Sequence, residues 1–174
     1  MSLELVAQRI ELILSDVDGV LTDGGLSFDN QGIETKRFHI RDGLGIRLWQ
    51  RAGYRFGVLT ARTSHIVKVR SAELGIDIVR QGFENKLPTA FDVIRELRLS
   101  PEQTCYIGDD LTDLPVMRAV GLGVAVADAA EEVRAYAGHV TRLPGGYGAV
   151  RELIETLLKA KARWDDLIHK YVAG

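Results

Sequence analysis

The sequence lacks several features that mark special classes of protein. It has one cysteine, Cys105, which excludes an internal disulfide and fits a reducing compartment. It has no long apolar run, and its first stretch, residues 1–16, carries Glu4, Arg9 and Glu11, which argues against a signal peptide and a membrane span. The net charge is only -2 and no run of Lys and Arg stands out. We therefore expect a cytoplasmic protein without nucleic-acid or membrane partners.

What the sequence does contain is enough apolar material for one folded unit. The chain has 174 residues, of which 46% are hydrophobic, about the size and composition of an ordinary domain. No internal repeat and no Pro-, Gly- or Ser-rich linker divides it. We expect a single domain over residues 1–174.

Short apolar runs alternate with longer segments of helical periodicity. Strands are predicted over residues 10–16, 55–60, 77–80, 104–108, 122–126 and 139–141. Helices are predicted over residues 43–52, 63–74, 88–98, 112–119, 129–137 and 148–170. This alternation indicates an α/β fold in which helices cover both faces of a parallel sheet, and ligands bind such sheets beyond the carboxyl ends of the strands.

Residues 24–38 interrupt this alternation. They contain two strand-like runs around Asp29-Asn30-Gln31-Gly32, which is a hairpin signal. Because the hairpin follows the first strand, it lies where a flap over the site would be placed. A solvated excursion without a function is the alternative.

Two carboxylates, Asp16 and Asp18, end the first predicted strand. Carboxylates this close repel one another, and a divalent ion with oxygen ligands, such as Mg²⁺, removes the repulsion. Gly19 lets the backbone turn sharply after them. Taken alone, the motif also fits an Asp-rich surface turn or a helix cap.

A second acidic cluster follows the strand that ends at Gly108. Asp109, Asp110 and Asp113 lie at the same edge of a parallel sheet as Asp16, so Asp109 is placed to complete a metal site. Asp113 either positions this loop or caps the following helix, and Asp110 fits both roles.

Two further polar residues lie at strand ends. Thr60 offers a hydroxyl and a backbone N–H to a phosphoryl oxygen, and Lys86 offers a compact cation. Each residue alone is weak evidence, but with the two acidic clusters they complete what phosphoryl transfer requires.

These four motifs, in this order, resemble the haloacid dehalogenase superfamily of phosphatases. The resemblance is closest to its capless, tetrameric subfamily that acts on 2-keto sugar acid phosphates such as 3-deoxy-D-manno-octulosonate 8-phosphate. The segments that carry it are SDVDGVLTDGGL, FHIRDGLGIRL, LTARTS, QGFENKL, YIGDDLTDLPVM and RLPGGYGAVRE, which together span roughly residues 13–157. The chain departs from the usual Thr-Gly-Arg at Ala61, and its tail from about residue 160 matches no motif.

The resemblance implies a three-layer Rossmann-like fold without a large cap domain, in which the hairpin of one subunit of a homotetramer covers the site of another. It implies that Asp16 attacks phosphorus and that Asp18 donates and later accepts the proton. It assigns the Mg²⁺ ligands to Asp16, Asp109 and the backbone carbonyl of Asp18. Thr60 and Lys86 would stabilise the transferring oxygens, and Asp113 would complete the catalytic set.

The resemblance also implies a pocket for the sugar acid, whose carboxylate suits a bidentate guanidinium. Besides Asp18 and Lys86, the residues expected in that pocket are His39, Ile40, Arg41, Asp42, Gly43, Arg47, Arg62 and Arg70. An arginine on a predicted helix, such as Arg47 or Arg70, is equally typical of a solvated surface.

Three rival functions fit parts of the pattern. A phosphatase of a sialic-acid-type 9-phosphate or another sugar phosphate would use the same motifs. A non-catalytic binding module of the same fold would be expected to have a damaged motif, and all four motifs are complete here. A receiver domain would have no need of an acid two residues after the phosphorylated Asp.

Overall fold

The apolar runs of the sequence form one six-stranded sheet in which all neighbouring strands are parallel. We describe residues 3–173 from a computed structural model. The strands follow the order β5-β4-β1-β6-β7-β8. Their bounds are β1 Leu12–Ser15, β4 Arg55–Thr60, β5 Ile78–Gln81, β6 Thr104–Gly108, β7 Leu122–Ala125 and β8 His139–Val140. Leu12 pairs with Arg55 on one side and Thr104 on the other, so β1 lies inside the sheet. The parallel sheet predicted from the sequence is confirmed.

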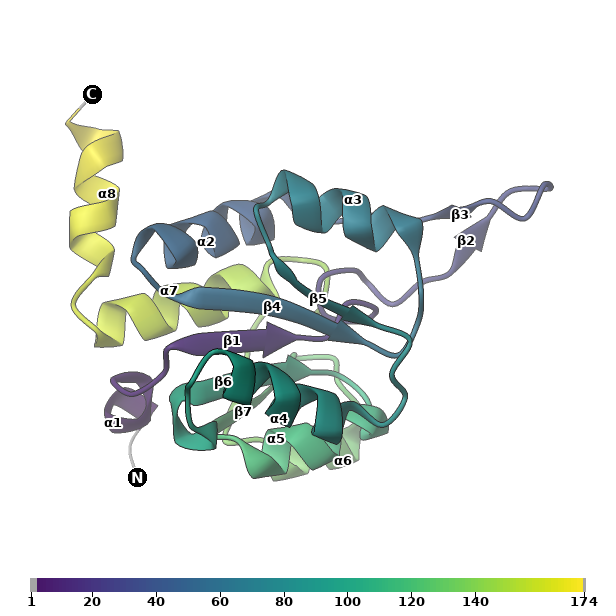
Figure 1. Ribbon diagram of the computed structural model, residues 1–174. Helices are drawn as coiled ribbons and strands as arrows, with labels where there is room; N and C mark the ends of the chain where they lie inside the picture. Colours follow the sequence, from purple (N-terminus) through teal and green to yellow (C-terminus); the bar gives the residue numbers. More distant parts are fainter. Residues whose placement is uncertain (1–2, 174) are drawn as a thin grey trace.

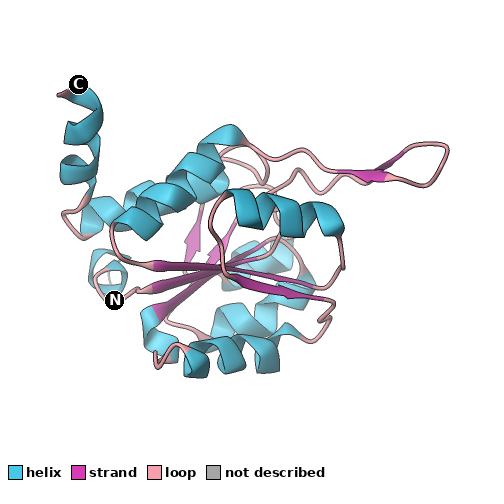
Figure 2. Ribbon diagram, turned by 45° about the horizontal axis from the view of Figure 1, so that its top comes forward, coloured by secondary structure: helices cyan, strands magenta, loops and turns pink. Residues whose placement is uncertain are grey.

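Helices cover both faces of this sheet, which makes three layers (Figure 1, Figure 2). Helices α2, α3 and α7 lie on one face and α4, α5 and α6 on the other. Their bounds are α2 Ile40–Arg51, α3 His65–Glu73, α4 Lys86–Glu96, α5 Leu114–Ala119, α6 Glu131–Tyr136 and α7 Ala149–Ala160. None of the helices within residues 3–173 has the length and apolar character needed to cross a membrane. No large cap domain accompanies the sheet among the described residues, as expected.

Burial on both faces explains why the inner strands are continuously apolar. Leu12, Ile13 and Leu14 in β1 and Cys105 and Ile107 in β6 are fully buried. A parallel strand covered by helices on two sides has no solvent face and therefore shows no polar alternation. This makes the inner strands the easiest elements to identify from the sequence.

The predicted helix over residues 148–170 is wrong as one element. Helix α7 ends at Ala160 and a separate helix, α8, runs from Trp164 to Val172. Ala162 adopts the left-handed conformation (φ 54°), and the N–H of Arg163 bonds back to the carbonyl of Leu158, which terminates α7 as a C-terminal cap does. No glycine marks this cap, so residue type gave no signal for the break.

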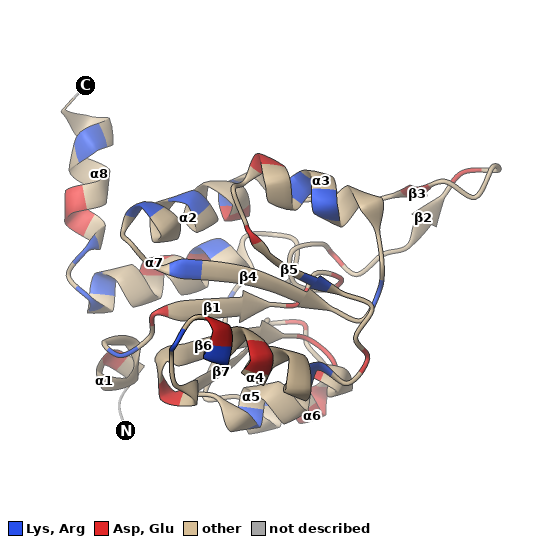
Figure 3. Ribbon diagram, in the orientation of Figure 1, with Lys and Arg blue, Asp and Glu red and all other residues tan. Residues whose placement is uncertain are grey.

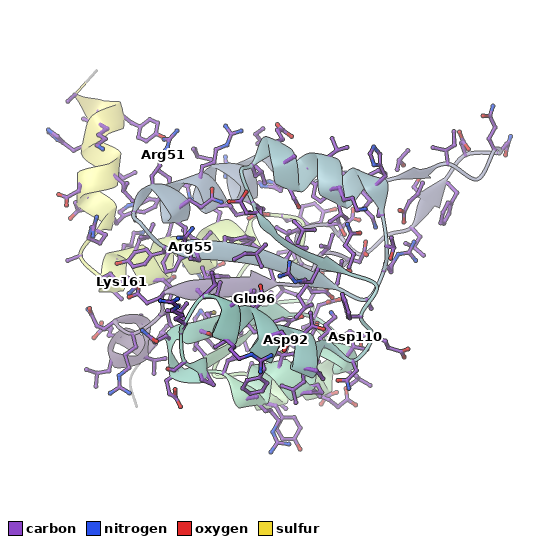
Figure 4. The ribbon with its side chains drawn as sticks, viewed as in Figure 1. Arg51, Arg55, Asp92, Glu96, Asp110 and Lys161 are labelled. Carbon is purple, nitrogen blue, oxygen red and sulfur yellow. The ribbon has the colours of Figure 1, made fainter. Side chains whose placement is uncertain are left out.

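Helix α8 extends from the body beside the C-terminal end of α2 (Figure 1). The Arg51 side chain, labelled in Figure 4, donates to the Tyr171 hydroxyl at 2.7 Å. Leu167 of α8 is buried, and α8 packs against α7. The predicted helix at 112–119 also differs, since a 3₁₀ turn (Leu111–Asp113) precedes α5. Two short elements were not predicted from the sequence: α1 (Leu3–Ala7) and a 3₁₀ turn at Pro101–Gln103.

The hairpin expected within residues 24–38 forms from β2 (Ser27–Phe28) and β3 (Glu34–Thr35), which pair antiparallel. At its tip, Asp29 Oδ1 accepts from the N–H groups of Gln31 and Ile33, both at 2.8 Å. Figure 1 shows the tip projecting away from the body. Within one chain, only the base of the hairpin approaches the carboxyl ends of the strands.

Candidate active site

Four sequence motifs meet where three adjacent strands end. Asp16 follows β1, Thr60 is the last residue of β4, and Asp109 follows β6. Lys86 is the first residue of α4, reached from β5. Figure 3 shows acidic positions in the loops at this end of the sheet, and Figure 4 labels Asp110 among them. A cleft of about 260 Å³ lies here, lined by Asp16, Asp18, Gly24, Thr60, Ala61, Arg62, Lys86, Asp109, Asp110 and Thr112.

The loop after β1 turns so that the carboxylate of Asp109 packs closely against it, beside Asp16. The backbone N–H of Val17 donates to Asp16 Oδ1 at 2.7 Å, and Gly19 adopts a left-handed conformation with φ +89°. A Cβ at Gly19 would lie 2.0 Å from Asp109 Oδ2. Glycine is therefore required at this position both by its backbone conformation and by the approach of the Asp109 carboxylate.

The glycine-rich segment before α7 packs against the same loop. The N–H of Gly146 donates to the carbonyl of Val20 at 2.9 Å, and a Cβ on Gly145 would lie 1.7 Å from the carbonyl oxygen of Gly19. The N–H of Gly145 donates to Asp128 at 2.8 Å. Neither Gly145 nor Gly146 lines the cleft, so this segment supports the loop after β1 without contacting the cleft.

One buried cation, Lys86, lies between two carboxylates. Its side chain is 1% exposed, and its Nζ lies 2.9 Å from Asp16 Oδ2 and 2.6 Å from Asp113 Oδ1. Burial alone would lower the pKa of Lys86, but the charges of Asp16 and Asp113 outweigh it and raise the pKa above its usual value. Lys86 is therefore a permanent positive charge at the base of the cleft.

Asp113 is the structural centre of this charge network. Its Oδ1 also accepts from the Tyr106 hydroxyl at 2.7 Å, and its Oδ2 accepts from the backbone N–H groups of Asp109 (2.9 Å) and Asp110 (3.3 Å). Both carboxylate oxygens are therefore occupied by donors of the chain, and they fix the loop that carries Asp109. Tyr106, a core residue of β6, was not foreseen as part of the site.

The carboxylate of Asp109 has no comparable partner. Its buried Oδ1 accepts no hydrogen bond from the residues that the structure describes. Burial, followed by the negative charges of Asp113, Asp16 and Asp110, raises the pKa of Asp109 to about 8. Burial, then the charge of Asp113, raises the pKa of Asp16 to about 6, although Lys86 opposes this rise. With Asp16, Asp109 and Asp113 ionised, Lys86 compensates one of three negative charges, so the cluster lacks two units of positive charge.

A divalent cation would supply that charge at the point where the carboxylates converge. Ligand oxygens from Asp16, Asp109 and Asp113 lie within 4.8 Å of one another. Both oxygens of Asp113 and both oxygens of Asp16 already face donors of the chain, whereas Asp109 Oδ1 has none among the described residues. Asp109 is therefore the carboxylate with an oxygen free for an ion. Hard oxygen donors of this kind suit Mg²⁺.

Asp18 points to the base of the hairpin. Lys36, just beyond β3, forms an ion pair with Asp18 Oδ1, and Arg62 Nε lies 3.7 Å from Asp18 Oδ2. Glu34 accepts from Arg62 at 2.6 Å and from the Ser64 hydroxyl at 3.1 Å. Glu34 and Lys36 lie in the predicted hairpin, but no role was expected for them, because nothing in their local sequence pattern indicates burial.

Of the arginines expected in the sugar-acid pocket, one chain brings only Arg62 to the cleft. Arg47 and Arg70 line a separate cleft of about 220 Å³ between α2 and α3, together with Ile40 and Gly43. Arg47 donates to the carbonyl of Glu73, and Arg70 to its carboxylate, both at 2.8 Å. Arg41 is exposed on the first turn of α2.

Asp42 has a role in the fold that the sequence did not indicate. It is 2% exposed, and its Oδ1 accepts from the N–H of Arg151 at 2.8 Å, so a side chain of α2 caps the first turn of α7. With His39 and Arg70 it also lines a cavity of about 10 Å³. Asp42 Oδ2, His39 Nδ1 and Arg70 Nε are buried there without a partner among the described residues, and the space suits one water molecule.

Comparison with known proteins agrees with this geometry. Residues 58–151, more than half of the chain, match the model of the haloacid dehalogenase-like hydrolases. The 3-deoxy-D-manno-octulosonate 8-phosphate phosphatase of Escherichia coli K12 is 45% identical over 160 residues, which cover 92% of this chain and 85% of that protein.

Two solved structures are similarly close. The 3-deoxy-D-manno-octulosonate 8-phosphate phosphatase of Moraxella catarrhalis, in complex with magnesium, phosphate and KDO, superposes with a TM-score of 0.95 at 38% identity, covering 97% of each chain. The cobalt-bound phosphatase of Haemophilus influenzae gives a TM-score of 0.89 at 42% identity, covering 91% of this chain and 93% of that one. The chain therefore belongs to the haloacid dehalogenase-like hydrolases, within the family of 3-deoxy-D-manno-octulosonate 8-phosphate phosphatases.

Proposed function

We propose that the chain is a Mg²⁺-dependent phosphatase that hydrolyses 3-deoxy-D-manno-octulosonate 8-phosphate to the free sugar acid and inorganic phosphate. The observation that carries the proposal is the convergence of Asp16, Asp109 and the buried Lys86 in one cleft. Membership of the phosphatase family supports the substrate.

In the proposed reaction, a carboxylate oxygen of Asp16 attacks phosphorus and forms an aspartyl-phosphate while the bond to the sugar oxygen breaks. Asp18 gives its proton to the departing sugar oxygen and then takes one from the water that hydrolyses the intermediate. Lys86 and the Thr60 hydroxyl, both buried at the base of the cleft, stabilise negative charge on the transferring oxygens. Asp113 orients Lys86 and the Asp109 loop without contacting the substrate.

The metal site fits Mg²⁺ by its donors and by its charge. Asp16, Asp109 and the backbone carbonyl of Asp18 would hold the ion, and the unpartnered Asp109 Oδ1 is the oxygen most in need of it. When bound, Mg²⁺ neutralises charge on the carboxylates and on the phosphate. Without it, the raised pKa values of Asp16 and Asp109 express the cost of holding two adjacent negative charges in a buried place.

The effect of Mg²⁺ on thermal stability should grow with pH. The pKa of Asp109 is raised from 3.8 to about 8 on folding, so between these pH values the unfolded chain ionises this carboxyl while the metal-free fold keeps it protonated. The metal-free fold therefore loses stability as pH rises through this window. Mg²⁺ binds the ionised form and removes this loss. Melting curves with and without Mg²⁺ should therefore show a larger increase in melting temperature at pH 8 than at pH 6.

The control for this measurement is Asp109→Asn, which keeps the side chain's shape and removes its charge. At pH 8 without metal it should melt above the wild type, because it buries no uncompensated charge, and Mg²⁺ should leave its melting temperature unchanged. An equal Mg²⁺ response in the variant and the wild type would place the ion elsewhere.

Purified protein assayed against a panel of phosphate esters tests the function itself. The panel contains 3-deoxy-D-manno-octulosonate 8-phosphate, a sialic-acid-type 9-phosphate, glucose 6-phosphate and 4-nitrophenyl phosphate, each with Mg²⁺ and with EDTA. We expect phosphate release only with Mg²⁺ and the highest kcat/KM for the eight-carbon acid. Preference for the 9-phosphate would favour that substrate class, and release from none would favour a binding module.

We further propose that the chain acts as a cytoplasmic homotetramer in which the hairpin reaches a neighbouring site. Its Leu26, Phe28 and Ile33 are 53%, 55% and 56% exposed, an arrangement typical of an unpaired contact surface. The Arg47 and Arg70 cleft would then belong to the complete pocket only in the assembly. Light scattering of the purified protein measures the mass of the particle in solution, which should correspond to four chains.

A further inference from the structure

Lys36 is a lysine in an unusual environment. Its side chain is 1% exposed, whereas lysine is almost never fully buried unless its charge is paired. Its Nζ forms ion pairs with Asp18 Oδ1 and with Glu34 Oε1, the latter at 3.3 Å. A buried ammonium is held in place by the carboxylates that compensate its charge, so its position is specified by these two partners.

The ion pair makes the two oxygens of Asp18 different. Oδ1 is occupied by Lys36. Oδ2 is buried and has no hydrogen-bond partner among residues 3–173, and Arg62 Nε, at 3.7 Å, is beyond hydrogen-bond distance. The carboxylate is therefore fixed at one oxygen and free at the other.

Lys36 is itself positioned independently of Asp18. Glu34, two residues earlier, accepts from Arg62 Nη2 at 2.6 Å and from the Ser64 hydroxyl at 3.1 Å. These bonds fasten the hairpin arm to the loop after β4, which also carries Thr60 at its start. A rigid support of this kind determines the orientation of the group that it holds.

We propose that Lys36 is a positioning residue of the phosphatase reaction, which fixes Oδ1 of Asp18 so that Oδ2 is the oxygen that transfers the proton. The inference rests on the proposed function. As the Asp16 oxygen–phosphorus bond forms and the phosphorus–sugar oxygen bond breaks, the proton on Asp18 Oδ2 moves to the sugar oxygen. The carboxylate that is left faces the Lys36 ammonium through Oδ1.

The test compares esters whose leaving groups differ in their need for a proton. An alkoxide of a sugar leaves only with protonation, whereas 4-nitrophenolate leaves as a stable anion. In Lys36→Met, we expect kcat/KM to fall about 100-fold for 3-deoxy-D-manno-octulosonate 8-phosphate, the range of a lost general acid, and less than about 5-fold for 4-nitrophenyl phosphate. Lys36→Gln keeps a polar side chain and replaces Lys36→Met in the test if that variant folds poorly. It should show the same larger loss on the sugar phosphate than on 4-nitrophenyl phosphate.

Two further variants are the controls. Lys36→Arg retains the charge and a donor and should recover most of the activity on the sugar phosphate. Arg37→Met changes the next residue of the same arm, which is largely exposed and donates to Asp23 at 2.7 Å and to Tyr147 at 2.8 Å. The ratio of its kcat/KM values for the two esters should equal that of the wild type.

The possible outcomes distinguish a failure of the inference about Lys36 from a failure of the proposed function. An equal loss on both esters in Lys36→Met and Lys36→Gln would overturn the inference, because Lys36 would then bind phosphate or maintain the fold. Full activity on both would overturn it too. A wild type inactive on every ester would instead refute the proposed function, whatever the variants do.

Discussion

Asp16→Asn should release no measurable phosphate from any ester. An amide oxygen does not form the acyl-phosphate on which the reaction depends, so turnover should fall at least about 10⁴-fold. The fold should survive, because the pKa of Asp16 is raised by burial and by the charge of Asp113, which means that a neutral side chain is tolerated there. Lys86 keeps Asp113 as its partner at 2.6 Å. Phosphate release and a melting curve of the same preparation measure both effects.

Asp110→Asn is the matched control for this prediction. Asp110 lies at the rim of the same cleft and is exposed, and its side chain caps the 3₁₀ turn, accepting from the N–H of Leu111 at 2.8 Å. The Asp110→Asn variant should keep most of the wild-type phosphatase activity. Turnover by Asp16→Asn within ten-fold of the wild type would show that another residue is the nucleophile.

Gly19→Ala should remove the metal site while leaving the rest of the sheet intact. A Cβ at this position lies 2.0 Å from Asp109 Oδ2, so the Asp109 carboxylate must move out of its place. A displacement of this size at a reacting centre costs on the order of 100-fold in activity. We expect that loss together with the absence of a Mg²⁺-induced increase in melting temperature.

Part of any loss will come from the backbone, because Gly19 has φ +89° and a side chain in that region costs about 1–2 kcal/mol. Gly53→Ala isolates this effect. Gly53 has φ +97° but no atom within 4 Å of the added Cβ, and it lies in the turn between α2 and β4. The Gly53→Ala variant should lose a similar amount of stability and keep the Mg²⁺-induced increase in melting temperature. If Gly19→Ala also keeps that response, Asp109 does not bind the ion.

The sheet and the cluster of its acidic motifs could be predicted because their signals are local. The apolar runs of β1, β4 and β6 identify strands by themselves, and Asp16, Thr60 and Asp109 each adjoin one of those runs. The rule that parallel strands end at one edge then brings the three residues together. The roles of these residues remain proposals that the variants above test.

The contacts that escaped prediction are distant in sequence or depend on backbone conformation. Lys36 reaches Asp18 from the hairpin, and Asp42 caps α7 through Arg151; neither pairing leaves a mark on the residues next to it. Tyr106 reads as one more core residue until its hydroxyl is seen on Asp113. Ala162 ends α7 in a conformation that alanine disfavours, so no residue preference indicates it.

The placement of β1 in the middle of the sheet also affects how the chain acquires its structure. Leu12, near the beginning of the sequence, has Arg55 as one neighbour and Thr104 as the other, and both arrive much later during synthesis. Parallel pairing over such separations is slow, since the entropy of closing a long loop must be overcome before any contact compensates for it. During that interval β1 has two edges with unpaired backbone N–H and C=O groups and exposed apolar side chains, which makes the nascent chain prone to association until β6 has emerged from the ribosome.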